Sequence, residues 1–198
     1  IGLGHVARCC ALYEALIEKN VEPLLIVNGD DSVKTILKKK RYEILNWLKK
    51  KESLRDIMSG ADTVIIDSYL ADLNVYKRIV RSVRTAVYLD DYKRIRYPEG
   101  MIINSAVGAH NIRYPKQKKT IFSLGPEYQP LRKEFWNVPA KGINNVVKSV
   151  LITFGGWDPD GMTQAVLKIL TYKYPKLKKI LVVGSGSIKN IDLKCLGG

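Results

Sequence analysis

The amino-acid sequence predicts an α/β fold with parallel sheets. Short apolar runs typical of buried strands alternate with segments of helical periodicity, and most runs are apolar at consecutive positions. A strand with two apolar faces needs cover on both, which helices on either side of a parallel sheet provide. A stretch rich in proline and glycine after Leu124 interrupts the pattern, which then restarts. We therefore expect two α/β units joined by a linker.

Each expected element follows from its local pattern. Helices are expected where apolar residues recur at near-helical spacing, over residues 6–19, 32–39, 53–59 and 73–83. Strands are expected at the apolar runs over residues 23–27, 42–45, 63–67, 85–90, 101–104 and 120–124. Ser32 stands at the start of the second helix and is its expected cap.

Composition also sets the expected domain boundaries. Residues 1–125 form the first domain, residues 126–147 the linker, and residues 148–198 the start of a second domain. The second domain has expected strands over residues 150–154 and 179–183 and a helix over residues 162–172. Two strands and one helix cannot bury a core, and a strand-to-helix loop opens the chain without a preceding strand. We therefore expect the sequence to be truncated at both ends.

Composition and charge exclude several classes of protein. Hydrophobic residues make up 46% and charged residues 26% of the 198 residues, as in globular chains. No apolar run approaches the roughly 18 residues of a membrane span. Three cysteines without a C-x-x-C pair indicate a reducing, cytoplasmic environment. The lysine runs behind the net charge of +14 lack interleaved aromatics and are interpreted as solvated faces. We expect a monomer that binds neither membrane nor nucleic acid.

A glycine-rich loop opens the chain. The run Gly2-Leu3-Gly4-His5-Val6-Ala7 fits G-x-G-x-x-A, the dinucleotide fingerprint of Rossmann-like folds, with Asp30 as a possible ribose ligand. Glycines admit a ligand to the backbone, and the unpaired N–H groups of a helix start attract an anion. His5 falls in the first helical turn, where the helix dipole favours a neutral imidazole. His5 is therefore a candidate general base, or a residue that caps the helix or packs against the sheet.

Further polar residues follow the expected strands at their carboxyl ends, where open α/β sheets bind ligands. These are Asp67-Ser68-Tyr69, Asp90-Asp91 and Gly155-Gly156. Each also suits a turn or a helix cap, so a structural role stays open. Asp90 and Asp91 point to opposite sides of an extended chain, so they are not expected to share a metal ion.

The order of these motifs resembles that of one enzyme family. The run Gly2-Leu3-Gly4-His5-Val6-Ala7-Arg8-Cys9 resembles the G-x-G-H-x-x-R-C signature of the nucleotide-sugar hydrolases of pseudaminic-acid synthesis and of related spore-coat polysaccharide proteins. Similar to later motifs of that family are Asp67-Ser68-Tyr69, Leu89-Asp90-Asp91, the stretch Leu124–Phe135 and the stretch Phe154–Pro159. These matches occur in order over essentially the whole chain.

The resemblance implies a GT-B-like enzyme with two Rossmann-like domains. Its expected reaction is hydrolysis of a UDP-linked diacetamido-trideoxy sugar for surface-glycan synthesis, without metal or cofactor. Water would attack the anomeric carbon with inversion, His5 would be the base, and Tyr69 would contact the water or a sugar substituent. Expected substrate-binding residues are Gly2, Gly4, Arg8, Asp67, Asp90, Gly155, Gly156 and Asp158.

Finer roles follow for the charged residues of this set. Asp67 and Asp90 are expected to orient or cap, and one of them could fix the His5 tautomer. Arg8 is expected to pair with a carboxylate or approach phosphate. Three other functions stay open: a GT-B glycosyltransferase that activates an acceptor hydroxyl, a dinucleotide-dependent oxidoreductase, and a basic nucleic-acid-binding module.

Overall fold

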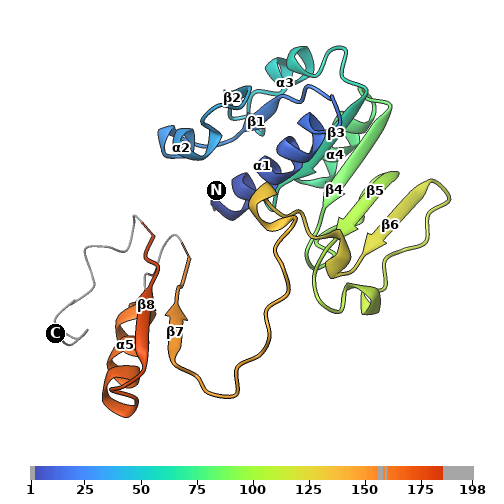
Figure 1. The fold of residues 1–198 in the computed structure, drawn as a ribbon. Coiled ribbons are helices and arrows are strands. Elements are labelled where there is room, and N and C mark those ends of the chain that lie inside the picture. Colours follow the sequence, from blue (N-terminus) through green and yellow to red (C-terminus); the bar gives the residue numbers. More distant parts are fainter. Residues whose placement is uncertain (1–2, 156–157, 159, 185–198) are drawn as a thin grey trace. The chain divides into compact units, whose positions relative to one another are not determined.

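The computed structural model describes residues 3–155, 158 and 160–184. The chain divides into one compact unit that ends at Val138 and a second that begins at Pro139. This division falls within the expected linker of residues 126–147. Each unit is described by itself below, with the element labels of Figure 1.

The first unit contains a four-stranded parallel sheet. Its strands are β3 (Thr63–Asp67), β4 (Thr85–Leu89), β5 (Gly100–Asn104) and β6 (Thr120–Leu124), and they lie in chain order (Figure 1). Asp67 is paired in register with Leu89, so the carboxyl ends of β3 and β4 meet at one edge. Positions 86–89 of β4 are all buried, as its continuous apolar run predicts. The α/β prediction with parallel sheets is confirmed.

The described residues of the first unit also form a smaller parallel sheet and four α-helices. The sheet pairs β1 (Leu25–Val27) with β2 (Tyr42–Ile44). The helices are α1 (Leu3–Ile17), α2 (Lys34–Leu37), α3 (Lys51–Ile57) and α4 (Leu73–Val80). The buried residues Val6 and Cys10 of α1 pack with Val33 and Leu37, and residues of β1 and β2 pack against this cluster. This packing fixes the orientation of α1 about its own axis, and therefore the direction in which the opposite face of the helix points.

The larger core lies around α4 and β4 and contains three tyrosines. The rings of Tyr76, Tyr88 and Tyr97 lie in mutual contact, with centroids 5.0 to 5.5 Å apart. Each buried hydroxyl has a partner: Tyr76 donates to the carbonyl of Ser68, and Tyr88 to that of Glu99. Buried phenols are stable only when so paired. These contacts anchor the loops that follow β3 and precede β5.

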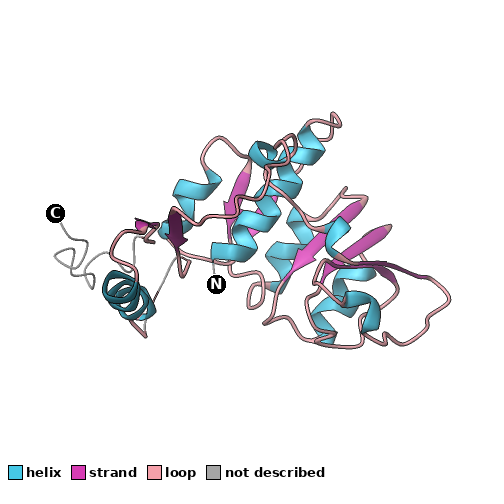
Figure 2. Ribbon diagram, turned by 60° about the horizontal axis from the view of Figure 1, so that its bottom comes forward, coloured by secondary structure: helices cyan, strands magenta, loops and turns pink. Residues whose placement is uncertain are grey.

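The second unit contains one parallel strand pair and one helix among its described residues. Strand β7 (Ser149–Ile152) pairs with β8 (Lys178–Leu181), and α5 (Met162–Lys173) connects them. Figure 2 shows that the segment between β6 and β7 consists largely of loop. Within the described part of the chain, no helix combines the length and the apolar character that a membrane span requires.

Several element ends differ from the prediction. Helix α1 begins at Leu3 rather than Val6, so Gly4 lies in the first helical turn and not in a loop. The expected helix over residues 32–39 is a 3₁₀-helix (Asp31–Val33) followed by the single turn α2. Its cap is Asp30, whose carboxylate accepts from the Ser32 N–H, and not Ser32. Asp30 is thus engaged at this helix start instead of being free for a ribose.

Candidate functional site

An imidazole and a carboxylate form the centre of the candidate site. His5 lies in the first turn of α1, and Asp67 is the last residue of β3. Nδ1 of His5 lies 2.7 Å from Oδ1 of Asp67. The His5 side chain is 20% exposed and that of Asp67 is 1% exposed, so solvent reaches the pair through the imidazole. Because a carboxylate only accepts hydrogen bonds, Nδ1 donates to it, and Nε2 of the neutral ring keeps its lone pair.

Arg8, one turn further along α1, holds two carboxylates together. Its Nε and Nη2 donate to the two oxygens of Asp67 at 2.9 and 2.7 Å. Its Nη1 and Nη2 donate to the two oxygens of Asp91 at 2.7 and 3.3 Å. Burial opposes the charge of Arg8, but the two carboxylates outweigh it and raise the pKa of the guanidinium. The predicted pairing of Arg8 with a carboxylate is confirmed.

Tyr69 joins the second carboxylate to the imidazole. Its hydroxyl donates to Oδ2 of Asp91. Its ring stands edge-on to that of His5, with the two centroids 4.4 Å apart. Burial and the hydrogen bond to Asp91 raise the pKa of Tyr69 to about 12, so the phenol keeps its proton at neutral pH. Tyr69 is nevertheless 43% exposed, and a ligand can reach it.

Two members of this cluster, Asp91 and Cys9, belong to motifs noted in the sequence but were not among the predicted site residues. Burial acts to raise the pKa of Asp91, but the hydrogen bonds from Arg8 and Tyr69 outweigh it and lower that pKa. The Cys9 thiol donates to Oδ2 of Asp67 at 4.0 Å, and burial together with Asp67 raises the pKa of Cys9 to about 12. Neighbouring residues of an extended chain point to opposite sides, so the sequence predicts that only one of Asp90 and Asp91 faces the site. It does not indicate which of the two does.

The loop after β3 is built to hold Tyr69 in place. The Ser68 hydroxyl accepts hydrogen bonds from the N–H groups of Leu70 and Ala71 at 3.2 and 3.1 Å, which closes a local turn. The Tyr76 hydroxyl, in the core, donates to the Ser68 carbonyl at 3.2 Å. These hydrogen bonds fix the backbone on both sides of Tyr69.

Asp90 lies in the interior, contrary to its prediction as a substrate-binding residue but in agreement with the expectation that it orients or caps. Its side chain accepts from the N–H groups of Lys93 and Arg94 at 2.7 and 3.2 Å. It also accepts from the hydroxyls of Tyr97, at 3.1 Å, and Tyr114. These four donors occupy the carboxylate, and Asp90 is only 2% exposed. It shapes the loop that carries Asp91, and we do not retain it as a ligand.

Of the other predicted site residues, Gly155 and Asp158 belong to the second unit, which is described by itself. In the second unit, Gly155 follows β7 with a φ of 79°, and Asp158 accepts from the N–H groups of Met162 and Thr163 at the start of α5. These hydrogen bonds lower the pKa of Asp158 and give it a capping role. Gly2 and Gly156 lie outside the described residues. Among the described residues, no group of three or more His, Cys, Asp or Glu side chains is arranged to hold a metal ion.

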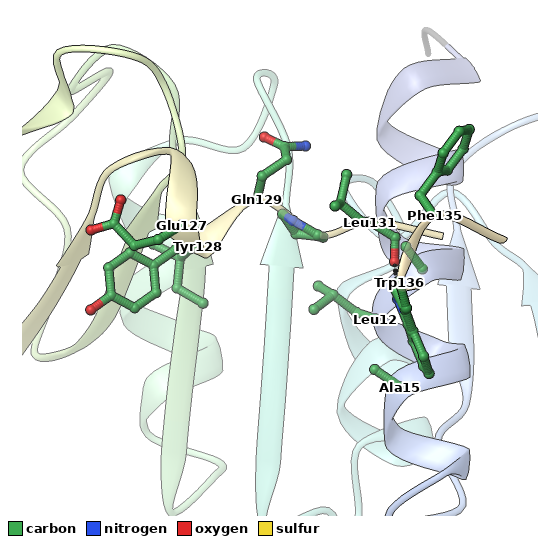
Figure 3. Close-up of a pocket in the computed structure, with 11 residues that line it drawn as sticks. Leu12, Ala15, Glu127, Tyr128, Gln129, Leu131, Phe135 and Trp136 are labelled. Atoms are coloured by element: carbon green, nitrogen blue, oxygen red, sulfur yellow. Dashed lines mark hydrogen bonds between the residues drawn. The ribbon is translucent and has the colours of Figure 1, made fainter. Parts of the chain in front are cut away.

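A groove of about 460 Å³ lies beside α1, apart from the predicted site residues. Figure 3 shows Leu12 and Ala15 of α1 on one side, with Leu131, Phe135 and Trp136 alongside. The Trp136 indole donates to the Leu131 carbonyl at 2.7 Å, which fixes its ring. Most of the other lining residues also come from the stretch after β6. The motif Leu124–Phe135 thus forms one wall of this groove.

The fold and the cluster define a class before any relative is considered. The chain is an α/β protein with parallel sheets, whose half-buried imidazole is backed by a buried carboxylate at the carboxyl edge of one sheet. No protein-family model matches it. It is similar to Uncharacterized protein MJ1062 of Methanocaldococcus jannaschii, with 28% identity over 184 residues. That match covers 87% of this chain but 38% of the relative, so the chain spans well under half of that protein's length.

Proposed function

We propose that this protein hydrolyses a UDP-linked sugar, with His5 as the general base. The observation that carries the proposal is the 2.7 Å contact of His5 Nδ1 with the buried Asp67, which leaves Nε2 of the half-buried imidazole as a proton acceptor. The class of substrate follows from the resemblance to nucleotide-sugar hydrolases, whose motifs supply both residues. A diacetamido-trideoxy sugar is the specific candidate, within a GT-B-like enzyme.

In the proposed reaction, this chain has to remove one proton from the nucleophile. In the proposed step the water oxygen forms a bond to the anomeric carbon, and its proton passes to Nε2 of His5. The bond between the anomeric carbon and the phosphate oxygen breaks, and UDP leaves with the electron pair. Asp67 stabilises the imidazolium that forms, because it already accepts from Nδ1. The base then returns its proton to solvent.

We assign the two carboxylates and Arg8 to positioning roles within the cluster and not to substrate binding. Arg8 donates to four carboxylate oxygens, so it is engaged within the cluster and is not kept as a phosphate ligand. Positioned bases of this kind contribute about 10²–10⁴-fold to rate. A glycosyltransferase would use the same base on an acceptor hydroxyl.

Substitution of the base tests the proposal in the full-length protein. We expect His5→Ala to lower UDP release from a UDP-sugar by about 10²–10⁴-fold, while UDP affinity changes by no more than a few-fold. Release is followed by coupled nucleotide detection and affinity by calorimetry. His110→Ala is the matched control, because His110 is the second histidine and stands outside the cluster. Full turnover in His5→Ala, or an equal loss of UDP binding, would contradict the assignment of His5 as the base.

A further inference from the structure

Basic side chains gather at the amino ends of the strands in the larger sheet. Strands β4, β5 and β6 are parallel neighbours, so the segments that precede them meet at one edge of the sheet (Figure 1). Two hydrogen bonds join the last two segments: the Gly100 N–H donates to the Lys119 carbonyl at 3.3 Å, and the Gln117 side chain donates to the Tyr97 carbonyl at 3.0 Å. We call the basic residues of the three segments the basic edge: Arg81, Arg84, Arg96, Lys116, Lys118 and Lys119.

The basic edge is exposed, and little negative charge lies beside it. All six residues are exposed, and in the described part of the chain only Lys119 of the six forms an ion pair. Its partner is Glu99, 3.8 Å away, and both side chains are more than half exposed, so solvent weakens the pair. A second carboxylate at this edge belongs to Asp62, whose carbonyl accepts from the Arg84 N–H. The six cations outnumber these two carboxylates and give the edge a positive potential.

The sequence does not reveal this gathering, because the six residues come from three connections. Taken by itself, Lys118-Lys119 is a short lysine run that a solvated face explains. The sheet brings that run beside residues of two other connections, since Gly100 of β5 pairs with Thr120 of β6 and β5 pairs with β4 in the same direction. The run is thus part of a larger cationic surface that spans three neighbouring strands.

We propose that the basic edge binds an anionic membrane surface, in contrast to the expectation from the sequence that this chain binds no membrane. A lipid leaflet presents its negative charge over a wide area, which fits cations that are spread over three connections. Each Lys or Arg that comes close to such a surface strengthens binding by about fivefold. Attraction of this kind needs no pocket, only cations that are exposed and unpaired.

A polynucleotide fits these features less well than a membrane does. Proteins that bind nucleic acid usually stack aromatic side chains on bases or place a helix in a groove. The tyrosines of β4 and of the segment before β5, Tyr88 and Tyr97, are buried. None of the segments 81–84, 96–99 and 116–119 contains a helix. The basic edge therefore offers charge without the contacts that recognise bases.

Binding at the basic edge leaves the candidate site accessible. Asp67 and Asp91 lie at the ends of β3 and β4, at the carboxyl edge, which is the opposite edge of the same sheet. None of the six basic residues belongs to the cluster around His5, so this inference does not rest on the proposed function. Membrane binding and hydrolysis are therefore tested separately.

Sedimentation with lipid vesicles tests the proposal. Full-length protein is mixed with vesicles of phosphatidylcholine alone and with vesicles that also contain phosphatidylserine, and the bound fraction is measured. We expect binding to the anionic vesicles only, and weaker binding at high salt because counterions screen exposed charges. The double substitutions Lys116→Gln with Lys118→Gln and Arg81→Gln with Arg84→Gln should each lower the partition coefficient by about 25-fold, which is about fivefold for each cation removed.

An equal change of charge elsewhere is the matched control. Lys168→Gln with Lys173→Gln removes two exposed lysines from α5 in the second unit, and its partition coefficient should stay within about twofold of wild type. Circular dichroism verifies that each variant is folded. An equal loss in the control would overturn the proposal, because net charge rather than the basic edge would then drive binding.

Two further results would also overturn it. One is wild-type protein that binds neither kind of vesicle, or both kinds equally. The other is retention of DNA through the same residues without binding to vesicles, which would identify a polynucleotide as the partner.

Discussion

Asp91 shows how much one carboxylate does in this cluster. It accepts hydrogen bonds from Arg8 and from Tyr69, and its side chain is 28% exposed, so the carboxylate is partly accessible to solvent. Hydrogen bonds to a carboxylate favour its ionised form. The ionised form is therefore the one that keeps the Tyr69 hydroxyl and the guanidinium in place.

A pH dependence of stability follows at the residue scale. The pKa of Asp91 is lowered in the folded protein from its ordinary value of 3.8, so its contribution is fully present above pH 3.8. That contribution is lost as the pH falls through the lower folded value. We expect wild type to be more stable than Asp91→Asn by about 1 kcal/mol at pH 6, and this difference to shrink below pH 3.8. Thermal unfolding of both proteins between pH 3 and 7 measures it, and a difference that stays constant into acid would contradict the role of the ionised carboxylate.

At the scale of the element, β5 begins under a tight constraint. Gly100 has a φ of 150°, a backbone conformation that other residues rarely adopt, and it pairs with Thr120 of β6. A Cβ at this position would lie 2.5 Å from the carbonyl oxygen of Ala86 and 2.9 Å from the Tyr88 ring. Both neighbours belong to the buried strand β4 and cannot move aside cheaply.

Substitution of Gly100 should therefore be costly. We expect Gly100→Ala to lower the free energy of unfolding by about 2 to 4 kcal/mol, from backbone strain and the contact with Ala86 together. Urea unfolding of the full chain measures this loss. Gly142→Ala is the matched control, since a Cβ there meets nothing within 4 Å, and its effect should be within about 0.5 kcal/mol of zero. Equal effects of the two substitutions would contradict this prediction, because they would show that β4 shifts to make room for the added Cβ.

The strands were more predictable from the sequence than the helix ends or the cluster. The apolar runs at 63–67 and 120–124 are strands with those same bounds, because β-branched and aromatic residues dominate both runs. The start of α1 was predicted too late because two glycines near it suggest a loop, whereas the structure continues the helix to Leu3. Asp90 and Asp91 could not be assigned, since the donors that bury Asp90 come from residues 93 to 114.

At the scale of the whole molecule, the linker contains the longest run of exposed residues in the described part of the chain. Residues 131–149 are all exposed, and residues 138–148 contain neither helix nor strand. Exposed backbone without regular hydrogen bonding is where proteases cut first. Lys141 offers trypsin a site in the middle of this segment.

Limited proteolysis tests this description. We expect the first tryptic cut after Lys141, with a product that contains the whole first unit, because α1 and the four-stranded sheet hold the preceding residues together. Mass spectrometry of the early products identifies the cut. Lys141→Gln should slow this cleavage, and any that remains should move to Lys148, next to β7. A first cut inside the four-stranded sheet would contradict the assignment of a compact first unit.

The contacts of Arg8 have one further consequence, which concerns electrostatic balance during turnover. One guanidinium faces two carboxylates, so with a neutral imidazole the assembly carries a single excess negative charge. In the proposed reaction the imidazole gains a proton as the diphosphate gains negative charge, and the excess disappears at that moment. The departing anion then leaves an electrically neutral group of side chains instead of one that repels it. The net negative charge of these side chains returns only when the imidazolium has lost its proton to bulk solvent.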